Sequence, residues 1–278
     1  MGLIMLSCID EKILSKEKKL SYLLRDMRRV LIAYSGGVDS LVLAKVAVET
    51  LGKNALSVIS SSPSLSASSL SRAVSLADEL NISLRVIKTD EFSDPRYLAN
   101  SPNRCYFCKS ALFTALSKIA REENFLSVCY GANADDEADW RPGMQAANEF
   151  GVRAPLLEAK LSKSEIREMA RVRGIKIWDS PAMPCTASRI PYGQPVTLEA
   201  IDRIEKGEEW LRRHEFKEVR VRDHHPVARI EVPIEAMAAI ISTPIRDELV
   251  KTFKDLGYQY VSIDLAGFRS GSLNEVLI

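Results

Sequence analysis

The sequence has little net charge, no long apolar run near its start and few histidines. Its 278 residues include 38 Lys and Arg against 37 Asp and Glu, so the formal net charge is +1. A chain with this charge has no overall field that attracts nucleic acid or an anionic membrane, which argues against a large RNA substrate. Residues 1–28 contain only short apolar stretches broken by Lys and Glu, so we expect no signal peptide, no membrane span and a cytoplasmic location.

Histidine and cysteine are both sparse. The three histidines, His214, His224 and His225, lie late in the chain, and nothing resembles a Ser-His-Asp triad. Only His224, close to Arg222, is a candidate for a site. The five cysteines, in a chain without a secretion signal, indicate a reducing compartment, where cysteines serve as ligands or catalysts more often than as disulfide partners.

The segment Ser35–Ser40, with the sequence SGGVDS, is the most informative motif. It follows an apolar run over residues 29–34 that is typical of a buried strand, and it precedes an apolar-faced helix expected over residues 41–49. A strand, a Gly-Gly turn and a helix start form an anion cradle, because glycines allow close backbone approach and free N–H groups point at negative charge. A simple tight turn is the alternative interpretation.

This loop is not a Walker A phosphate loop, since the Lys-Ser/Thr ending is missing. It resembles the SGGxDS signature of the PP-loop ATP pyrophosphatases, which cleave ATP between its α and β phosphates and pass the adenylyl group to an acceptor oxygen. In that interpretation, the backbone of Ser35, Gly36 and Gly37 and the hydroxyl of Ser40 hold pyrophosphate. Asp39 then helps to place the Mg²⁺ that offsets the phosphate charge.

Strand patterns and helix patterns alternate along the first part of the chain. We expect strands at 55–60, 83–89 and 127–130, a short further strand at 152–155, and helices at 10–28, 67–80, 109–123 and 163–173. The alternation predicts an α/β fold with a doubly wound parallel sheet and helices on both faces. Ligands of such sheets bind beyond the carboxyl ends of the strands, an edge that would gather Ser35–Ser40, Ser60 and Gly131.

The pattern changes beyond residue 178. Residues 179–196 are rich in proline and are expected to form an irregular segment between domains. A charged helix near 197–213, strands near 218–222 and 227–232, and a last strand near 258–264 predict a small α+β domain. We therefore expect a PP-loop ATP pyrophosphatase domain over 1–178, a cysteine-bearing segment over 179–196, and a smaller domain for substrate binding or oligomerisation over 197–278.

Three cysteines have surroundings that favour a chemical role. Cys105 and Cys108 form a C-x-x-C pair directly before a helix, and both features favour the thiolate. Cys185 lies in a segment too exposed in composition for a core cysteine. A zinc site requires four ligands, whereas a four-iron cluster held by three cysteines leaves one iron open to a ligand such as hydrosulfide. Half a zinc site, a redox pair and chance are the alternatives for the pair. Cys129, inside an apolar strand, is expected to be buried.

Together these stretches resemble the LarE family of ATP-dependent sulfur transferases, and the resemblance covers nearly the whole chain. It rests on Ser35–Ser40, Asn103–Lys109, Asn133–Asp136, Arg141–Gly143, Pro184–Gly193, Val219–Arg222, Ala228–Glu231 and Asp264–Ser272. It implies that ATP adenylates a carboxylate of pyridinium-3,5-biscarboxylic acid mononucleotide, and that sulfur from hydrosulfide or another donor then displaces AMP. The product is a bis-thiocarboxylic acid used to build the nickel-pincer nucleotide of lactate racemase. The resemblance also implies a homo-oligomer.

The resemblance further implies roles for individual residues. In three-cysteine members, the cysteines that match Cys105, Cys108 and Cys185 hold a 4Fe–4S cluster that delivers sulfide. In single-cysteine members, the cysteine that matches Cys185 gives up its own sulfur. Because this chain has all three, we favour the cluster, with the sacrificial route as the alternative. Arg220 and Arg222 match a pair that holds the substrate phosphate, a contact suited to arginine.

Several polar residues have two interpretations. Ser188 and Arg189, shortly after Cys185, either orient the activated carboxylate or simply hydrogen-bond within their loop. Arg220 and Arg222 are two apart on a strand and share one face, and such a stripe is often plain surface. Glu208 and Glu209 are interpreted as surface charges rather than metal ligands, and Asp135, Asp136 and Asp139 as helix caps or Mg²⁺ ligands.

Three other functions compete with sulfur transfer to a small molecule. A tRNA-thiolating PP-loop enzyme would need a basic RNA-binding face, which the net charge of +1 disfavours. An amidating synthetase would have no need for the three cysteines. A nucleotide-binding scaffold would not turn over ATP at all. We therefore expect an enzyme that uses ATP and a small mononucleotide, and no nucleic acid or membrane partner.

Overall fold

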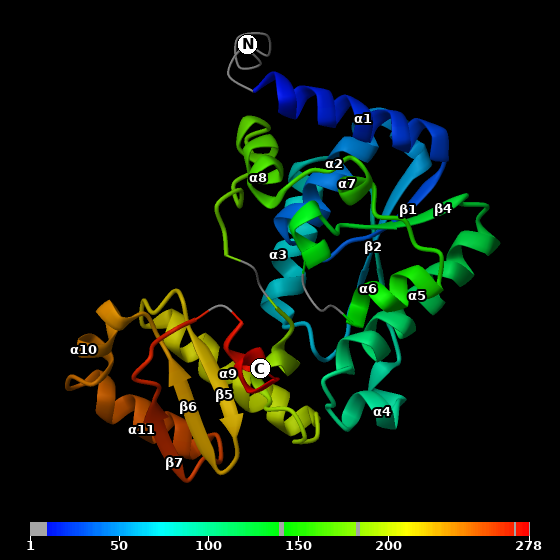
Figure 1. The fold of residues 1–278 in the computed structure, drawn as a ribbon. Helices are drawn as coiled ribbons and strands as arrows, with labels where there is room; N and C mark the ends of the chain where they lie inside the picture. Colours follow the sequence, from blue (N-terminus) through cyan, green and yellow to red (C-terminus); the bar gives the residue numbers. More distant parts are fainter. Residues whose placement is uncertain (1–9, 139–141, 182–183, 270, 278) are drawn as a thin grey trace. The chain divides into compact units, whose positions relative to one another are not determined.

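The computed structural model describes residues 10–138, 142–181, 184–269 and 271–277 (Figure 1). The chain forms two compact units, the first made of Met1–Glu91 and Cys105–Met183 and the second of Phe92–Arg104 and Pro184–Ile278. The domain boundaries expected from the sequence, 1–178, 179–196 and 197–278, stay a prediction. None of the described helices is long and apolar enough to cross a membrane.

The first unit holds the alternating strands and helices. Its elements are α1 (Glu11–Met27), β1 (Val30–Ala33), α2 (Val38–Leu51), η2 (Gly52–Asn54), β2 (Ala55–Ser60), α3 (Ala67–Glu79), β3 (Leu84–Ile87), α5 (Arg104–Glu122), β4 (Ser127–Tyr130), η4 (Ala134–Ala138), α6 (Pro142–Glu149), α7 (Pro155–Glu158) and α8 (Lys163–Val172). The four strands are parallel and lie in the order β3-β2-β1-β4. Residues 152–155, expected to be a strand, make one isolated bridge between Arg153 and Cys129.

The sheet of this unit is covered on both faces, as the period of two along β1 requires. Val30 and Ile32 pack in an apolar cluster with residues of α1, α2, α3 and α8. Leu31 and Ala33 pack in a second cluster, with residues of α5 and α6. Figure 1 shows α5 and α6 on the side of the sheet away from α1 and α2. The doubly wound α/β fold predicted from the sequence is confirmed.

Local sequence explains where the outer helices begin. Asp10 accepts a hydrogen bond from the backbone N–H of Lys12 and caps α1. Ser162 and Glu165 form a complete capping box at α8, the motif read in the sequence. The Glu165 carboxylate is also 2.6 Å from Lys16 Nζ of α1, so the cap ties the two helices together.

The strand register brings three chain segments to one edge. Ala33 of β1 is paired with Val58 of β2 and with Tyr130 of β4. Ser35, Ser60 and Ala132 each lie two residues after one of these paired residues. Ser60 is the last residue of β2, and Ser35 and Ala132 lie just beyond β1 and β4, at the edge where open parallel sheets bind ligands.

The second unit is the predicted small α+β fold. Its elements are α4 (Pro95–Leu98), η5 (Thr186–Arg189), α9 (Leu198–Arg213), β5 (Arg220–His224), β6 (Val227–Glu231), η6 (Ile234–Ala236), α10 (Met237–Ile240), α11 (Ile245–Asp255), β7 (Tyr260–Ile263) and η7 (Ser272–Leu277), and η3 (Glu91–Ser93) leads into it. β5 and β6 are antiparallel, and β6 and β7 are parallel. The core includes Leu211, Val221 and Phe253. A Cβ at Gly207 would lie 3.0 Å from the Phe253 ring, so glycine permits the approach of α9 to α11.

Candidate functional site

The Ser35–Ser40 loop joins β1 to α2 in a conformation that demands glycine. Gly36 has a φ of 75°, in the left-handed region. A Cβ at this position would also lie 2.6 Å from the Cβ of Ala73 on α3. Both the backbone angle and the packing of α3 therefore exclude a side chain at Gly36.

The hydroxyl of Ser40 braces the loop from inside. It donates to the carbonyl of Gly37 at 3.0 Å and accepts from the backbone N–H of Ser35 at 3.1 Å. The Ser35 hydroxyl is 3.0 Å from the same oxygen. Ser40 is only 5% exposed, and these hydrogen bonds stabilise the loop conformation. Its contact with pyrophosphate stays a prediction.

Asp39 and Asn133 join the loop to the end of β4. Asn133 Nδ2 donates to Asp39 Oδ2 at 3.1 Å, and no described residue donates to Asp39 Oδ1. Burial raises the pKa of Asp39, while the hydrogen bond from Asn133 opposes that rise. A carboxylate with one oxygen fixed and the other uncommitted suits a cation at this edge.

The acidic residues that follow Asn133 act as caps. Asp136 accepts the backbone N–H of Asn133 at 3.0 Å. Asp135 accepts the backbone N–H of Lys163, the first residue of α8, at 2.7 Å. The capping interpretation is thus confirmed for both, and Asp139 lies outside the described residues. Gly131 has a packing role as well, because a Cβ there would lie 2.9 Å from the backbone nitrogen of Ser40.

A chain of hydrogen bonds runs from the end of β2 to a buried carboxylate. The Ser60 hydroxyl is hydrogen-bonded to the Thr89 hydroxyl, and Thr89 Oγ1 donates to Glu91 Oε2 at 2.6 Å. Glu91 is 2% exposed, whereas Ser60 is partly exposed. Ser60 was predicted from the sequence, and the two residues behind it were not.

The cysteines differ in their surroundings as expected. Cys105 and Cys185 are exposed and Cys108 is half-buried, and none of these three is in a disulfide. Cys105 and Cys108 lie three residues apart in the first turns of α5, so both thiols share one face of the helix. Cys129 is fully buried and burial raises its pKa to about 12, which confirms its assignment as a core residue.

Cys105, Cys108 and Cys185 have the right chemistry to ligate an iron–sulfur cluster, but among the described residues their arrangement does not form a ligand group. Cys105 and Cys185 are exposed, Cys108 is half-buried, and soft sulfur ligands suit iron. Over the part of the chain that the structure describes, no three His, Cys, Asp or Glu side chains are placed as a metal-ligand group. The cluster expected from the resemblance therefore stays a prediction.

Arg189 organises the loop that carries Cys185. It is 5% exposed and makes two hydrogen bonds to Glu208, at 2.8 and 3.1 Å. Its Nη1 donates to the carbonyls of Pro184 and Cys185 at 2.7 and 3.0 Å and to the Ser188 hydroxyl at 3.1 Å. The guanidinium is thus occupied by its own loop and by α9.

Two further buried residues order the segment after Cys185. The Asn100 amide nitrogen donates to the carbonyls of Pro191 and Gln194, both at 2.8 Å. Arg104 donates to Asn100 Oδ1 and, at 3.0 Å, to the carbonyl of Ala187. Asn100 is fully buried, so these contacts replace the water that the loop carbonyls would otherwise bind.

Arg222 is buried in a polar network. Its guanidinium makes two hydrogen bonds of 2.9 Å to Glu231, which is 0% exposed. It also donates to the Ser188 carbonyl at 2.8 Å and to the Ser272 hydroxyl at 2.6 Å. Arg222 therefore links β5, β6, the Cys185 loop and η7, and most of its donors are engaged.

Arg220 differs from its neighbour. Its Nη1 donates to the carbonyl of Val219 at 2.8 Å and its guanidinium lies 4.9 Å from the Phe268 ring centre, but no described carboxylate pairs with it. Burial lowers the pKa of Arg220 to about 10, and the charges of Arg189 and Arg222 act in the same direction. A half-buried cation among other cations favours an anion.

His224 lies beside the same strands. Its Nε2 accepts a hydrogen bond from Arg229 Nε at 3.2 Å, so the ring is neutral in this arrangement. Burial and the charge of Arg229 lower the pKa of His224. His214 and His225 belong to other surroundings, with His214 stacked on Trp210.

Sequence reasoning missed the carboxylates of this polar network. Glu208 is 4% exposed, so its interpretation as a surface charge is wrong, whereas Glu209 is exposed and paired with Arg213 as that interpretation expects. Ile201, Ile204 and Leu211 are buried on α9, and Glu208 shares their face. A charge at an apolar position of a helix is a signal that could have identified it.

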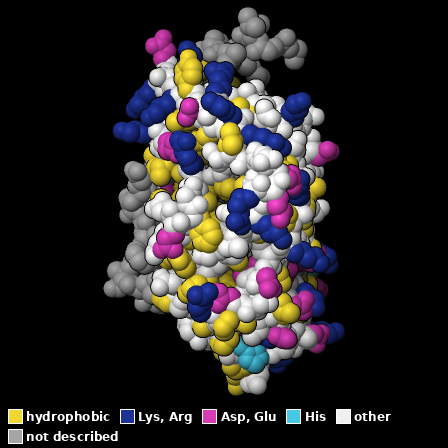
Figure 2. Space-filling view, turned by 90° about the vertical axis from the view of Figure 1, so that its right-hand side faces the viewer, with side chains coloured by type: hydrophobic (Ala, Val, Ile, Leu, Met, Phe, Trp, Pro, Cys, Tyr) yellow, Lys and Arg dark blue, Asp and Glu magenta, His cyan; other side chains and the backbone are white. Residues whose placement is uncertain are grey.

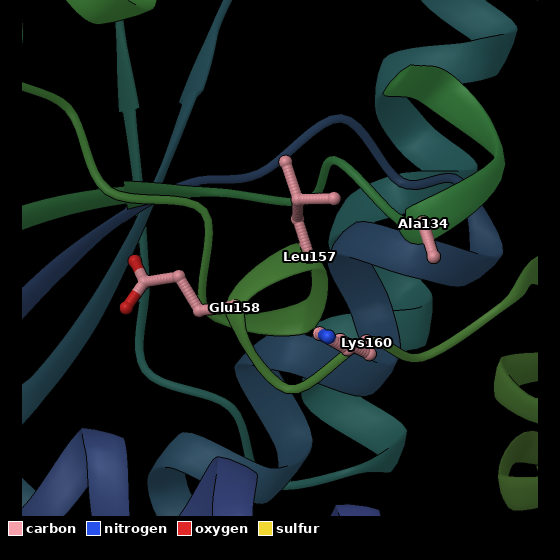
Figure 3. Close-up of a pocket in the computed structure, with 4 residues that line it drawn as sticks. All are labelled: Ala134, Leu157, Glu158 and Lys160. Atoms are coloured by element: carbon pink, nitrogen blue, oxygen red, sulfur yellow. The ribbon is translucent and has the colours of Figure 1, made fainter. Parts of the chain in front are cut away.

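Two hollows of the surface border these groups, and the smaller, about 350 Å³, is lined by residues that include Gln194, Asp223 and His225. The larger, about 480 Å³, is lined by Ala134, Leu157, Glu158 and Lys160 (Figure 3). Figure 3 shows the Glu158 side chain pointing away from Ala134, and its carboxylate accepts hydrogen bonds from Arg153. On the face in Figure 2, Lys and Arg side chains are interspersed with Asp and Glu.

Known proteins resemble most of the chain. The family described as NAD synthase matches residues 18–96, which include the Ser35–Ser40 loop. An uncharacterized protein of Synechocystis is 44% identical over 263 residues, covering 95% of this chain and 98% of that protein. The pyridinium-3,5-bisthiocarboxylic acid mononucleotide synthase of Lactiplantibacillus plantarum is 34% identical over 264 residues, 95% of each chain. An uncharacterized protein of Methanocaldococcus jannaschii is 35% identical over 243 residues, 87% of this chain and 92% of that protein.

Proposed function

The chain belongs to the LarE family of pyridinium-3,5-bisthiocarboxylic acid mononucleotide synthases, and we propose that it catalyses ATP-dependent sulfur transfer to a pyridinium mononucleotide. The observation that carries this proposal is the Ser35–Ser40 loop at the carboxyl edge of a parallel sheet, in a chain that also exposes Cys105 and Cys185. Activation by ATP and a sulfur carrier are the two requirements for replacing a carboxylate oxygen by sulfur.

The first step is adenylation. A substrate carboxylate oxygen attacks the α phosphorus of ATP, the bond to the bridging oxygen breaks, and pyrophosphate leaves. The Ser35, Gly36 and Gly37 backbone holds the departing pyrophosphate, since free N–H groups before a helix N-terminus favour an anion. Asn133 fixes Asp39 Oδ2, and the Asp39 carboxylate would hold Mg²⁺, which would supply charge neutralisation at the phosphates.

The second step is sulfur insertion. Hydrosulfide attacks the acyl carbon, AMP leaves with one carboxylate oxygen, and a proton is released, which yields a thiocarboxylate. Repetition at the second carboxylate gives the bisthiocarboxylic acid. A 4Fe–4S cluster on Cys105, Cys108 and Cys185 would supply the sulfide when bound. Arg189 keeps the Cys185 carbonyl fixed, so the sulfur carrier is presented from a rigid loop.

The second unit binds the mononucleotide phosphate. Arg220 is the principal ligand, because it is half-buried and no described carboxylate pairs with it. Arg222 supports the site through Glu231 and contributes its remaining N–H. Ser188 and Arg189 position the Cys185 loop near the reacting carboxylate. A homo-oligomer is part of the proposal, by analogy with the family.

Substrate-dependent pyrophosphate release tests the adenylation step. Purified protein with ATP and Mg²⁺ should release pyrophosphate only when pyridinium-3,5-biscarboxylic acid mononucleotide is added. Release driven equally by bulk tRNA or by ammonia would favour the competing enzymes. No release with any acceptor would favour a nucleotide-binding scaffold.

Iron analysis tests the source of sulfur. Protein prepared without air should contain about four irons per chain, and Cys105→Ser should lose them while Cys129→Ala, which changes a core cysteine, keeps them. Absence of iron from the wild-type protein would point to sacrificial donation from Cys185. In that case the chain would lose the mass of hydrogen sulfide after one turnover.

A further inference from the structure

Three side chains of the first unit form a hydrogen-bond chain at the nucleotide edge. Ser60 ends β2, Thr89 follows β3, and Glu91 begins η3. Thr89 Oγ1 is bonded both to Ser60 Oγ and to Glu91 Oε2, the latter at 2.6 Å. The nucleotide-binding roles proposed above use only Ser60 of these three.

The buried carboxylate fixes the direction of every proton in this chain. Thr89 Oγ1 donates its single hydroxyl proton to Glu91 Oε2. The Thr89 oxygen can then only accept from Ser60, which uses the single proton of Ser60. The Ser60 oxygen is left with lone pairs, and no described residue donates to it.

Ser60 therefore faces the ligand edge as an acceptor. It is partly exposed, while Glu91 behind it is 2% exposed and shielded from water. Ser60 stands two residues beyond Val58, just as Ser35 of the phosphate loop stands two beyond Ala33, and Val58 and Ala33 are paired. Adjacent parallel strands are about 4.8 Å apart, so Ser60 is one strand from the loop, within reach of the nucleoside of a nucleotide whose phosphates bind there.

We propose that Ser60 Oγ accepts a hydrogen bond from the 6-amino group of adenine, and that Thr89 and Glu91 are positioning residues that select adenine by fixing this direction. This inference rests on the proposed use of ATP and deepens it. A 6-oxo base offers an acceptor at the same place, and two acceptors facing each other leave a hydrogen bond unmade. Such a mismatch weakens binding by about tenfold or more.

Equilibrium binding of ATP and ITP, measured by calorimetry on the full chain, tests the proposal. ITP carries a 6-oxo group in place of the 6-amino group. The wild-type protein should bind ATP at least about tenfold more tightly than ITP. Thr89→Val frees the Ser60 proton, so the ratio of ATP affinity to ITP affinity should fall toward one. Thr89→Ser keeps the hydroxyl chain and should retain the wild-type ratio.

Glu91→Gln provides a second variant if Thr89→Val does not fold. Its amide can donate to Thr89, which permits the chain to reverse, and the ATP preference should again fall. A preference that is absent in the wild type, or unchanged in both variants, overturns the proposal. If the variants instead change the preference for ATP over 2′-deoxy- or 3′-deoxy-ATP, Ser60 contacts the ribose. That result also overturns the proposal. Binding is measured without substrate, so this result stands apart from any failure of sulfur transfer.

Discussion

Arg189 and Glu208 form a buried bidentate ion pair directly behind the backbone carbonyl of Cys185. Both side chains are about 5% exposed, and the guanidinium has no donor nitrogen that lacks a partner. The pair therefore acts on the proposed chemistry through the loop that carries the cysteine.

Removing the Glu208 charge should destabilise the second unit. Glu208→Gln leaves Arg189 buried without its counter-charge, and we expect a loss of about 3–5 kcal/mol in the free energy of unfolding. The neighbouring Glu209→Gln is the control, since that exposed pair with Arg213 contributes at most about 1 kcal/mol. Urea unfolding measures both. Equal effects of the two variants would show that the buried pair adds no stability.

The same pair predicts an acid-sensitive stability. Burial alone would raise the pKa of Glu208, but the charge and hydrogen bonds of Arg189 outweigh burial and lower it. A carboxyl with a lowered folded-state pKa stabilises the fold above its unfolded pKa of about 4.3 and loses that contribution as pH falls further. Unfolding free energy should therefore fall less steeply below this pH in Glu208→Gln than in wild type. Parallel curves would contradict the assignment.

The phosphate loop should not tolerate a methyl group at Gly36. Gly36→Ala combines a positive φ with a contact of 2.6 Å to Ala73, and we expect loss of ATP-dependent pyrophosphate release. Gly174→Ala is the matched control, because its φ of 68° is also positive but no atom lies within 4 Å of the added Cβ. The free energy of unfolding of both variants should fall by about 1 kcal/mol, because alanine is strained at a positive φ. Activity retained in Gly36→Ala would contradict the requirement for a close approach of Ala73 to the phosphate loop.

Asn133 should set the acid limit of adenylation. Its hydrogen bond opposes the burial that raises the pKa of Asp39, so Asn133→Leu should raise that pKa further. Mg²⁺ requires the ionised carboxylate, and the acid limb of the pH–rate profile should move to higher pH. Asn148→Leu, on an exposed position of α6, is the control and should leave the limb unchanged. An unmoved limb in Asn133→Leu would separate Asp39 from the reaction.

Arg220 should bind an anion without supporting the fold. Arg220→Gln removes a half-buried cation that no described carboxylate pairs with, so the urea midpoint should not fall. The KM for the mononucleotide should rise by about tenfold or more, because a charge-assisted hydrogen bond to phosphate is lost. Arg213→Gln, an exposed control on α9, should leave KM unchanged. A lower midpoint with unchanged KM would make Arg220 a structural residue.

The sequence patterns were sufficient for the fold because period and order determine it. Val30 and Ile32 alternate with Leu31 and Ala33, and this alternation assigns β1 to the middle of a covered sheet. The capping box at Ser162 likewise required only neighbouring residues. Residues 152–155 were harder to assign, because a single bridge to Cys129 leaves no periodic signal.

The network around Cys185 could not be predicted because its members are far apart in the chain. Arg222 meets Ser272 and Ser188 only after β5, η7 and the Cys185 loop have folded together. Glu91 gains its role from Thr89 and Ser60, which belong to the ends of different strands. Such contacts follow from tertiary structure, and local patterns do not encode them.

The central claim is that ATP drives replacement of a carboxylate oxygen by sulfur, and mass spectrometry of the mononucleotide measures this directly. The wild-type protein, kept without air, is incubated with pyridinium-3,5-biscarboxylic acid mononucleotide, ATP, Mg²⁺ and sulfide, and Cys185→Ala is treated in parallel. We predict products in which one and then two oxygens are replaced by sulfur, with AMP and pyrophosphate formed in equal amounts, and none from Cys185→Ala. A mononucleotide of unchanged mass from the wild-type protein, despite ATP consumption, would contradict the account.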